Sequence, residues 1–385
     1  MEKIYLDNAA TSFPKPKEVA VAVYNHMMDC GVNINRGGYQ SAYDVAGTVL
    51  ETREILAEMF NASDCRNVVF TKNITESLNV VLKGFLKPGD HVLCSSIEHN
   101  AVMRPLVQLS SSGVSFDRIP ANDRGEMDVD AIRSMIRPET VAIVCTHASN
   151  VFGTLNPIKE IGEIAHENNL KFIVDAAQTA GVMDIDMQEM HIDALCFTGH
   201  KSLLGPQGIG GFILAEDMVS CIDPLITGGT GSVSHTELTP DFMPDRFEAG
   251  TMNLPGIIGL HEGLLWIRNR GLDNIRRHEL GLTQYFLDGL TALVNDGRIS
   301  VYGMPGTDGR VGVVSIQTLN VDLAEAAFKL DYEYGIMTRV GLHCAPNSHK
   351  TLGTYPMGTI RFSFGNFNTI EDVDAALRAL DEITE

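Results

Sequence analysis

Three side chains in this sequence have the types and settings that covalent chemistry needs: a carboxylate, an amine and a thiol. Asp175 directly follows a short apolar run, where a buried strand is expected to end. Lys201 lies between the apolar run Ala194–Phe197 and the glycine-rich turn Gly205–Gly211. Cys344 lies in a turn-rich segment between two strand-like runs. Because ligands of open α/β sheets collect at the carboxyl ends of strands, we expect Asp175 and Lys201 to share one site.

This combination suits pyridoxal 5′-phosphate (PLP), a cofactor with three requirements. A lysine must bind it covalently, a carboxylate must pair with its ring nitrogen, and polar donors must hold its phosphate. Lys201 and Asp175 meet the first two requirements, and a lysine beside apolar residues is partly desolvated, which lowers its pKa. The predicted phosphate donors are Thr75, Thr198 and His200.

Each of these residues also has an ordinary role to weigh against the chemical one. Asp175 and Thr75 are good helix caps, and an isolated lysine is nearly always a solvated surface group. His99, which we expect to stack on the cofactor ring, would alone be a surface or capping histidine. Cys344 alone would be an inert loop thiol. The set of residues, rather than any single one, favours a catalytic site.

The elements that must position these residues alternate between strands and helices. Strands are expected at Asn67–Thr71, His91–Ser95, Val114–Ile119, Val141–Thr146, Phe172–Val174, Ala194–Thr198 and Ile209–Leu214, with helices at Thr75–Leu86 and Pro157–Asn169. This alternation predicts an α/β fold, in which a mainly parallel, mixed sheet is flanked by helices.

The pattern changes near residue 256. Long helices are expected at Ile257–Arg270 and Leu272–Val294, strands at Val311–Gln317, Ile336–Arg339 and Thr359–Phe364, and a last helix at Thr369–Ile383. We therefore predict a large cofactor-binding domain over residues 14–256. Residues 257–385, together with residues 1–13, are predicted to form a smaller α+β domain.

The composition narrows the class of protein. The chain has 385 residues and a formal net charge of −20, which disfavours binding to nucleic acid. It has no apolar stretch long enough to span a membrane, and its first residues lack a signal-peptide pattern, so we expect a cytoplasmic protein without a membrane partner. Cys94, Cys145 and Cys196 lie in apolar runs and are expected in the core. His343, Cys344 and His349 lack a fourth ligand with zinc-site spacing, so no metal is expected.

Several motifs, in order along nearly the whole chain, resemble the class V aminotransferase family of fold-type I PLP enzymes. They are Tyr5–Thr11, Ser149–Thr154, Asp175–Gln178, Gly199–Lys201 and Arg246–Thr251. Within that family, Arg339–Ala345 followed by Thr359–Ser363 resembles the cysteine desulfurases and selenocysteine lyases that have a short catalytic-cysteine loop.

The resemblance implies further roles. Gln178 would approach the ring oxygen of PLP, and Thr251 would reach the phosphate from a second subunit, so the active unit would be a homodimer. Asn150 and Arg361 would bind the substrate amino acid, with Arg361 on its carboxylate, and Arg36 would lie at the mouth of the site. The sequence departs from the family at Ile74, which replaces a hydroxyl residue, and at Val340 and Leu342 beside the cysteine.

The predicted activity is conversion of L-cysteine to L-alanine, with the sulfur transferred to Cys344 as a persulfide. Arg339, Arg361 and His343 are expected to favour the thiolate of Cys344. A sulfur-acceptor protein, as in iron–sulfur cluster assembly, would take the sulfur onward. The alternatives are a selenocysteine lyase, an aminotransferase or epimerase of the same family, and a scaffold that only binds a partner.

Overall fold

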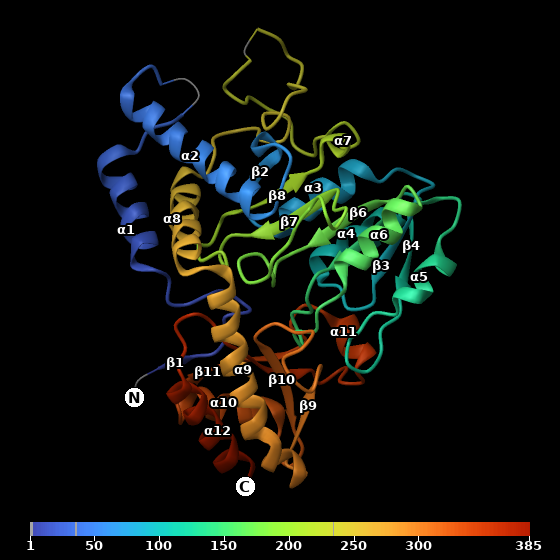
Figure 1. Ribbon diagram of the computed structural model, residues 1–385, viewed down its shortest axis with the longest axis vertical. Helices are drawn as coiled ribbons and strands as arrows, with labels where there is room; N and C mark the ends of the chain where they lie inside the picture. The colour runs from blue at the N-terminus through green and yellow to red at the C-terminus, as the bar shows by residue number, and fades with distance from the viewer. Residues whose placement is uncertain (1–2, 35–36, 234) are drawn as a thin grey trace.

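The computed structural model describes residues 3–34, 37–233 and 235–385 (Figure 1). Its helices are α1 (Lys17–Asn25), η1 (His26–Cys30), α2 (Gln40–Met59), η2 (Cys65–Asn67), α3 (Ile74–Phe85), α4 (Asn100–Ser110), α5 (Val129–Met135), α6 (Ile158–Glu167), α7 (Glu216–Val219), α8 (Leu254–Arg270), α9 (Leu272–Asn295), α10 (Leu323–Tyr332), α11 (Pro346–Thr351) and α12 (Ile370–Thr384). Its strands are β1 (Ile4–Tyr5), β2 (Val68–Thr71), β3 (His91–Ser95), β4 (Ser115–Ile119), β5 (Thr140–Thr146), β6 (Lys171–Asp175), β7 (Ala194–Thr198), β8 (Gly210–Leu214), β9 (Ile299–Tyr302), β10 (Val313–Thr318), β11 (Ile336–Met337), β12 (Arg339–Gly341) and β13 (Thr359–Ser363). No helix within the described ranges is long and apolar enough to cross a membrane.

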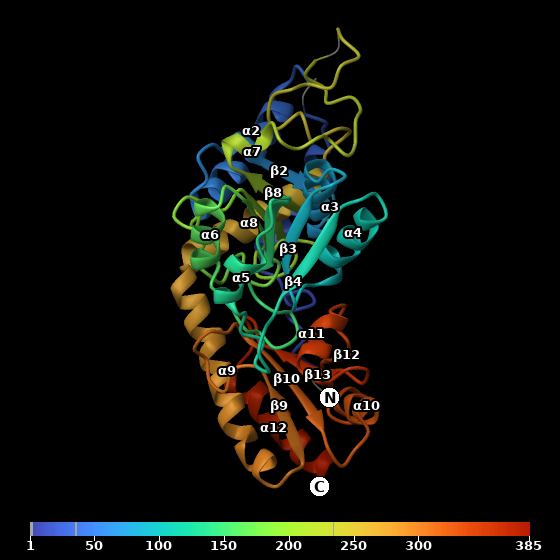
Figure 2. The ribbon, with the colours of Figure 1, turned by 90° about the vertical axis from the view of Figure 1, so that its right-hand side faces the viewer.

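The larger sheet has the order β2-β8-β7-β6-β5-β3-β4. The neighbouring strands from β7 to β4 run parallel, and β8 runs antiparallel to both β7 and β2. Strands β3, β6 and β7 are apolar almost throughout because helices cover both faces. Helices α2, α6 and α8 pack on one face, and helices α3 and α4 pack on the other (Figure 2).

The smaller sheet is antiparallel, with the order β12-β13-β10-β9. Helices α9 and α12 bury their apolar sides against it, around Phe286 and Phe362. The N-terminal strand β1 pairs in parallel with β11, and Asp7 bridges to Ser363 at the end of β13. The first residues described therefore lie with the C-terminal part of the chain, next to the smaller sheet.

The α/β fold predicted from the sequence is confirmed. Every expected strand of the larger sheet forms within two residues of its predicted position. The expected strand Ile336–Arg339 is instead divided between β11 and β12, which belong to different sheets. The division of the chain at residue 256 stays a prediction; it falls inside α8, whose side chains Leu260 and Leu264 pack in the core beside the larger sheet.

Candidate active site

Asp175 and Lys201 lie at the carboxyl ends of the neighbouring parallel strands β6 and β7. Asp175 is the last residue of β6, and its Oδ1 accepts a hydrogen bond from the N–H of Ala177 at 2.9 Å. Burial raises the pKa of this carboxyl, and the charge of Lys201 opposes that rise. Burial likewise lowers the pKa of Lys201 to about 8. The site therefore holds a carboxylate and an amine that loses its proton near neutral pH, as a carbonyl-binding lysine requires.

The predicted phosphate donors gather around the start of α3. Thr198 is the register partner of Gly210, and Gly210 is the partner of Thr71, so Thr198 lies level with the turn that leads into this helix. A side chain at Gly210 would come within 2.9 Å of the backbone of Asn73, so glycine lets the sheet approach the helix start closely. Thr75 is in the first turn and is exposed.

Two of these donors have buried atoms without a hydrogen-bond partner in the described residues. Within the described residues, Thr198 Oγ1 and His200 Nδ1 are buried and form no hydrogen bond. Burial lowers the pKa of His200 to about 4, so its imidazole is neutral and can donate without carrying a charge. Orphaned buried donors beside a helix N-terminus form a site for an anion, and a phosphate group would satisfy them. The residues present thus fit the phosphate of PLP.

His99 caps the N-terminus of α4 and is fixed as a neutral ring. Its Nδ1 accepts a hydrogen bond from the N–H of Ala101 at 3.0 Å, which leaves the proton on Nε2. Burial and the nearby charges of Lys201 and Arg339 lower its pKa to about 4. Gln178 lies after β6 and donates from Nε2 to the carbonyl of Ala9 at 3.1 Å.

Arg361 lies in the middle of β13, with its guanidinium buried. Its Nη1 donates to the carbonyl of Asn150 at 2.9 Å, and its Nη2 pairs with Asp7 Oδ1 at 2.6 Å. Burial lowers the pKa of Arg361, and Asp7 opposes that shift. Nε remains without a partner in the described part of the chain. The guanidinium of Arg361 is thus a charged clamp that still has an N–H group free to donate to a carboxylate.

Cys344 is exposed in the turn between β12 and α11. Both His343 and Cys344 have positive φ, 48° and 58°, a conformation that costs free energy for any residue with a side chain. The carbonyl of Cys344 accepts from the N–H of Asn100 at 2.8 Å, and Asn150 Nδ2 donates to the carbonyl of His343 at 2.7 Å. Asn150 therefore links the arginine clamp to the thiol loop.

The expectation that His343 favours the thiolate of Cys344 as a neighbouring cation is wrong. The ring of His343 is buried, with Nε2 close to Thr359 Oγ1 at 3.1 Å. Burial and the charge of Arg361 lower its pKa to about 2, so it is neutral. The positive charges near the loop are those of Arg361, which is already paired with Asp7, and Arg339, which is exposed on β12.

Two further predicted residues stand differently. Thr251 is exposed and lines a cavity of about 160 Å³, together with Lys72 and Glu76 beside the start of α3. The neighbouring Glu248 anchors that segment by pairing with Arg53 at 2.7 Å. The predicted contact of Thr251 with the phosphate in a second subunit stays a prediction. Arg36 lies outside the described residues.

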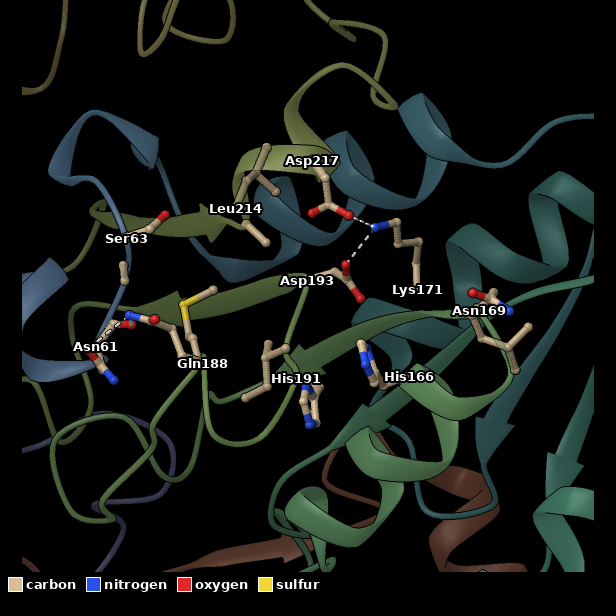
Figure 3. Close-up of a pocket in the computed structure, with 15 residues that line it drawn as sticks. Asn61, Ser63, His166, Asn169, Lys171, Gln188, His191, Asp193, Leu214 and Asp217 are labelled. Carbon is tan, nitrogen blue, oxygen red and sulfur yellow. Dashed lines mark hydrogen bonds and ion pairs between the residues drawn. The ribbon is translucent and has the colours of Figure 1, made fainter.

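A larger cavity of about 510 Å³ lies at the opposite edge of the sheet, where β6 begins and β8 ends (Figure 3). Lys171 there pairs with Asp193 at 2.8 Å and with Asp217, and His166 stacks on His191 with ring centroids 4.3 Å apart. None of the predicted site residues lines it, and its charged groups already have partners. It therefore offers no support for the predicted chemistry.

The comparison with known families agrees with the motifs. The family model Aminotransferase class-V matches residues 4–376. The chain belongs to this family. A "Probable cysteine desulfurase" from Halobacterium salinarum is 35% identical over 98% of this chain and 91% of its own length. The "Cysteine desulfurase" of Haloferax volcanii is 32% identical over 99% of this chain and 89% of its own length.

Solved structures of the family agree with the fold. The apo structure of a cysteine desulfurase from Thermococcus onnurineus has a TM-score of 0.91 and 33% identity, covering 99% of this chain and 94% of its own. An Escherichia coli cysteine desulfurase in an S-sulfonic acid form has a TM-score of 0.87 and 29% identity, covering 99% and 94%. The chain is thus similar over its whole length to these class V proteins.

A departure from the family motif has a structural reason. Ile74, where the class V pattern often has a hydroxyl residue, is buried in the apolar core beneath α3. Its side chain packs between the helix and the sheet and has no hydrogen-bond donor for a phosphate. The hydroxyl of Thr75 and the backbone N–H groups of the first turn are the donors that remain there.

Two acidic residues of the candidate site were not assigned roles from the sequence. Asp7 lies within the Tyr5–Thr11 motif, and its pairing with Arg361 was not predicted. Glu98 immediately precedes His99 and is buried; its Oε1 accepts from Ser95 Oγ at 2.5 Å and from the N–H of Thr146 at 2.7 Å. Burial raises the pKa of Glu98 to about 8. Its place after a buried strand, like that of Asp175, was the available signal.

Proposed function

We propose that the protein is a PLP-dependent cysteine desulfurase, which converts L-cysteine to L-alanine and takes the sulfur onto Cys344 as a persulfide. The observation that carries this proposal is the exposed Cys344 loop, which Asn150 ties to the buried clamp of Arg361. A thiol displayed beside an amino-acid carboxylate site can meet the sulfur of a bound cysteine. An aminotransferase has no need of such a thiol.

Lys201 would hold PLP through its amino group, with Asp175 on the ring nitrogen, His99 against the ring, and Gln178 near the ring oxygen. Thr75, Thr198 and His200 would bind its phosphate. When bound, PLP supplies an electron sink that lets the Cα–H and Cβ–S bonds of the substrate break. With His99 and His200 neutral, the charges that act on the pKa of Lys201 are those of Asp175, Arg361, Arg339 and Asp7.

Arg361 binds the substrate carboxylate, for which Asp7 holds the guanidinium in place beforehand. Asn150 orients the substrate beside it. Lys201, whose pKa is near 8, accepts the proton from Cα and returns a proton later, since both of its states are populated near neutral pH.

The sulfur step takes place at Cys344. Its thiolate attacks the substrate sulfur, the Cβ–S bond breaks, and the sulfur remains on Cys344 as a persulfide. The three-carbon fragment gains a proton at Cβ and leaves as L-alanine. The electrons of the broken bond stay with that fragment, so no external oxidant or reductant is needed.

We also propose that the active unit is a homodimer with Thr251 reaching the phosphate of the second copy. The exposed position of Thr251, on a cavity that it lines with Lys72 and Glu76, supports this, because a second copy can reach it there. Exposed apolar side chains on α1, η1 and α2, among them Tyr24, Met27 and Tyr43, offer a surface for a second copy.

The deciding experiment is incubation of the PLP-loaded protein with L-cysteine and a reductant, with alanine and sulfide measured together. We expect equal amounts of both products. Cys344→Ala should abolish sulfide release and persulfide formation while PLP stays bound. Cys221→Ala is the matched control, because Cys221 is also exposed and contacts Asp217, which lines the cavity at the opposite edge of the sheet. Full persulfide yield from Cys344→Ala contradicts the proposal, and a much faster reaction with selenocysteine favours a selenocysteine lyase.

A further inference from the structure

A groove lies beside the Cys344 loop, between α4 and β4 on one side and the start of α11 on the other. Figure 2 shows α11 beneath α4 and β4. The groove has a volume of about 350 Å³, and its lining includes Asn100, Arg104, Val107, Arg118 and Asn347. We define it below as the α4–α11 groove.

The groove is structurally joined to the reactive loop. Asn100, on its wall, donates its N–H to the carbonyl of Cys344 at 2.8 Å. Ser348 in α11 donates from Oγ to the carbonyl of Ile97 at 3.0 Å, which fixes α11 against the segment that leads into α4. A ligand in the groove would therefore lie within a few residues of the thiol, outside the buried cofactor site.

The charge of the groove is opposite to that of the chain. The protein has a net charge of −20, yet Arg104 and Arg118 both line this groove and are exposed. Neither forms an ion pair with any carboxylate in the described residues. Arg118 lies over the ring of Phe116, with its guanidinium carbon 5.1 Å from the ring centroid. This contact orients the guanidinium without neutralising it.

The rest of the lining suits a peptide rather than an inorganic ion. Val107 is 57% exposed and the buried Met103 also lines the groove, so the groove has an apolar part beside its two cations. The buried Glu98 also borders the groove, and its raised pKa of about 8 keeps it neutral at pH 7, so it does not repel an anion. A volume near 350 Å³ holds a few residues of an extended chain.

We propose that the α4–α11 groove binds an acidic peptide segment that carries the acceptor thiol for the sulfur on Cys344. This rests on the proposed function and names the partner of that same site. The acceptor thiolate attacks the outer sulfur of the Cys344 persulfide, the sulfur–sulfur bond breaks, and Cys344 leaves as a thiolate. The acceptor then carries the persulfide, and the exchange consumes neither oxidant nor reductant.

The test uses the PLP-loaded protein charged with sulfur from isotope-labelled L-cysteine. Two pentapeptides serve as acceptors, each with a central cysteine, flanked by aspartates in one and by asparagines in the other. We expect faster transfer to the acidic peptide, and a decline of that advantage with added salt. The double variant Arg104→Ala/Arg118→Ala should slow transfer to the acidic peptide about tenfold and leave the asparagine peptide within about twofold. Arg378→Ala, an exposed arginine on α12, is the matched control.

Binding is measured separately from chemistry with the acidic peptide in which serine replaces cysteine, by fluorescence anisotropy. Weaker binding to the double variant than to the Arg378→Ala control supports the groove even if no persulfide forms. Equal transfer to both peptides, or equal binding to both variants, overturns it. Failure of the charging step alone, with arginine-dependent binding intact, counts against the desulfurase function and not against the groove.

Discussion

The two ends of the candidate site are built in opposite ways. At the cofactor end, Asp175 and Thr198 are buried at the carboxyl edge of the larger sheet, among polar atoms that lack partners. At the sulfur end, Cys344 is exposed on a turn with positive φ, held by backbone contacts to α4 and by Asn150. Proton transfer benefits from burial, because burial shifts the pKa of a lysine toward neutrality. Sulfur delivery requires a thiol that a second molecule can reach.

This comparison predicts that removing the amine of Lys201, at the buried end, has the largest effect on the rate of alanine formation. Lys201→Ala should slow alanine formation by about 10³-fold or more, because Lys201 is the amine proposed to move the Cα proton. Single-turnover alanine assays measure this. Lys350→Ala, an exposed lysine on α11, is the control and should stay near the unmodified rate. A Lys201→Ala variant within tenfold of that rate would contradict the assignment.

The next largest effect is expected where the two ends meet, at the arginine clamp. Arg361→Lys should raise the KM for L-cysteine about ten- to a hundredfold, because lysine cannot bind a carboxylate and the carbonyl of Asn150 in the same fork geometry. The kcat should change less. Arg378→Lys is the matched control. If kcat falls while KM is unchanged, Arg361 acts on the chemical step or on the fold and not as the substrate clamp.

The third prediction concerns Glu98, and it tests whether burial keeps this carboxyl protonated and neutral in the folded protein. Its ordinary pKa of 4.5 rises to about 8 in the folded protein, so folding takes up a proton at intermediate pH. The free energy of unfolding should therefore fall as pH rises from about 4.5 to 8, by up to about 1.4 kcal/mol per pH unit, and this contribution should level off above pH 8.

In Glu98→Gln this contribution to the pH dependence should disappear, because glutamine does not ionise and still accepts the hydrogen bonds of Ser95 and Thr146. Urea denaturation midpoints at pH 6 and pH 8 measure the difference between the two proteins. Glu139→Gln, an exposed substitution, is the control. If the unmodified protein and Glu98→Gln lose the same free energy of unfolding between pH 6 and pH 8, Glu98 is ionised in the folded state.

The smallest effect is expected for stability at the exposed end. Cys344→Ala should change the free energy of unfolding by less than about 0.5 kcal/mol, because the thiol is exposed and makes no hydrogen bond in the described structure. Thermal unfolding of the variant without substrate measures this. A change of several kcal/mol would mean that the thiol supports the fold, and would weaken the contrast between the two ends.

The sequence by itself determined the local elements and the chemical types of the site. Its apolar runs predict the strands because a parallel sheet covered on both faces needs continuous apolar side chains. The same runs place Asp175 and Lys201 at strand ends, where the structure brings them together. Motif order in the sequence also identified the class V family.

Only the tertiary structure decided how these groups are charged and joined. Asp7 pairs with Arg361 from the other end of the chain, and Asn150 links Arg361 to the Cys344 loop, contacts that no spacing along the sequence encodes. The neutral states of His343 and Glu98 likewise follow from burial, which depends on every element packed around them. Sequence fixes which groups can titrate, whereas the folded surroundings set the free energy of charging them.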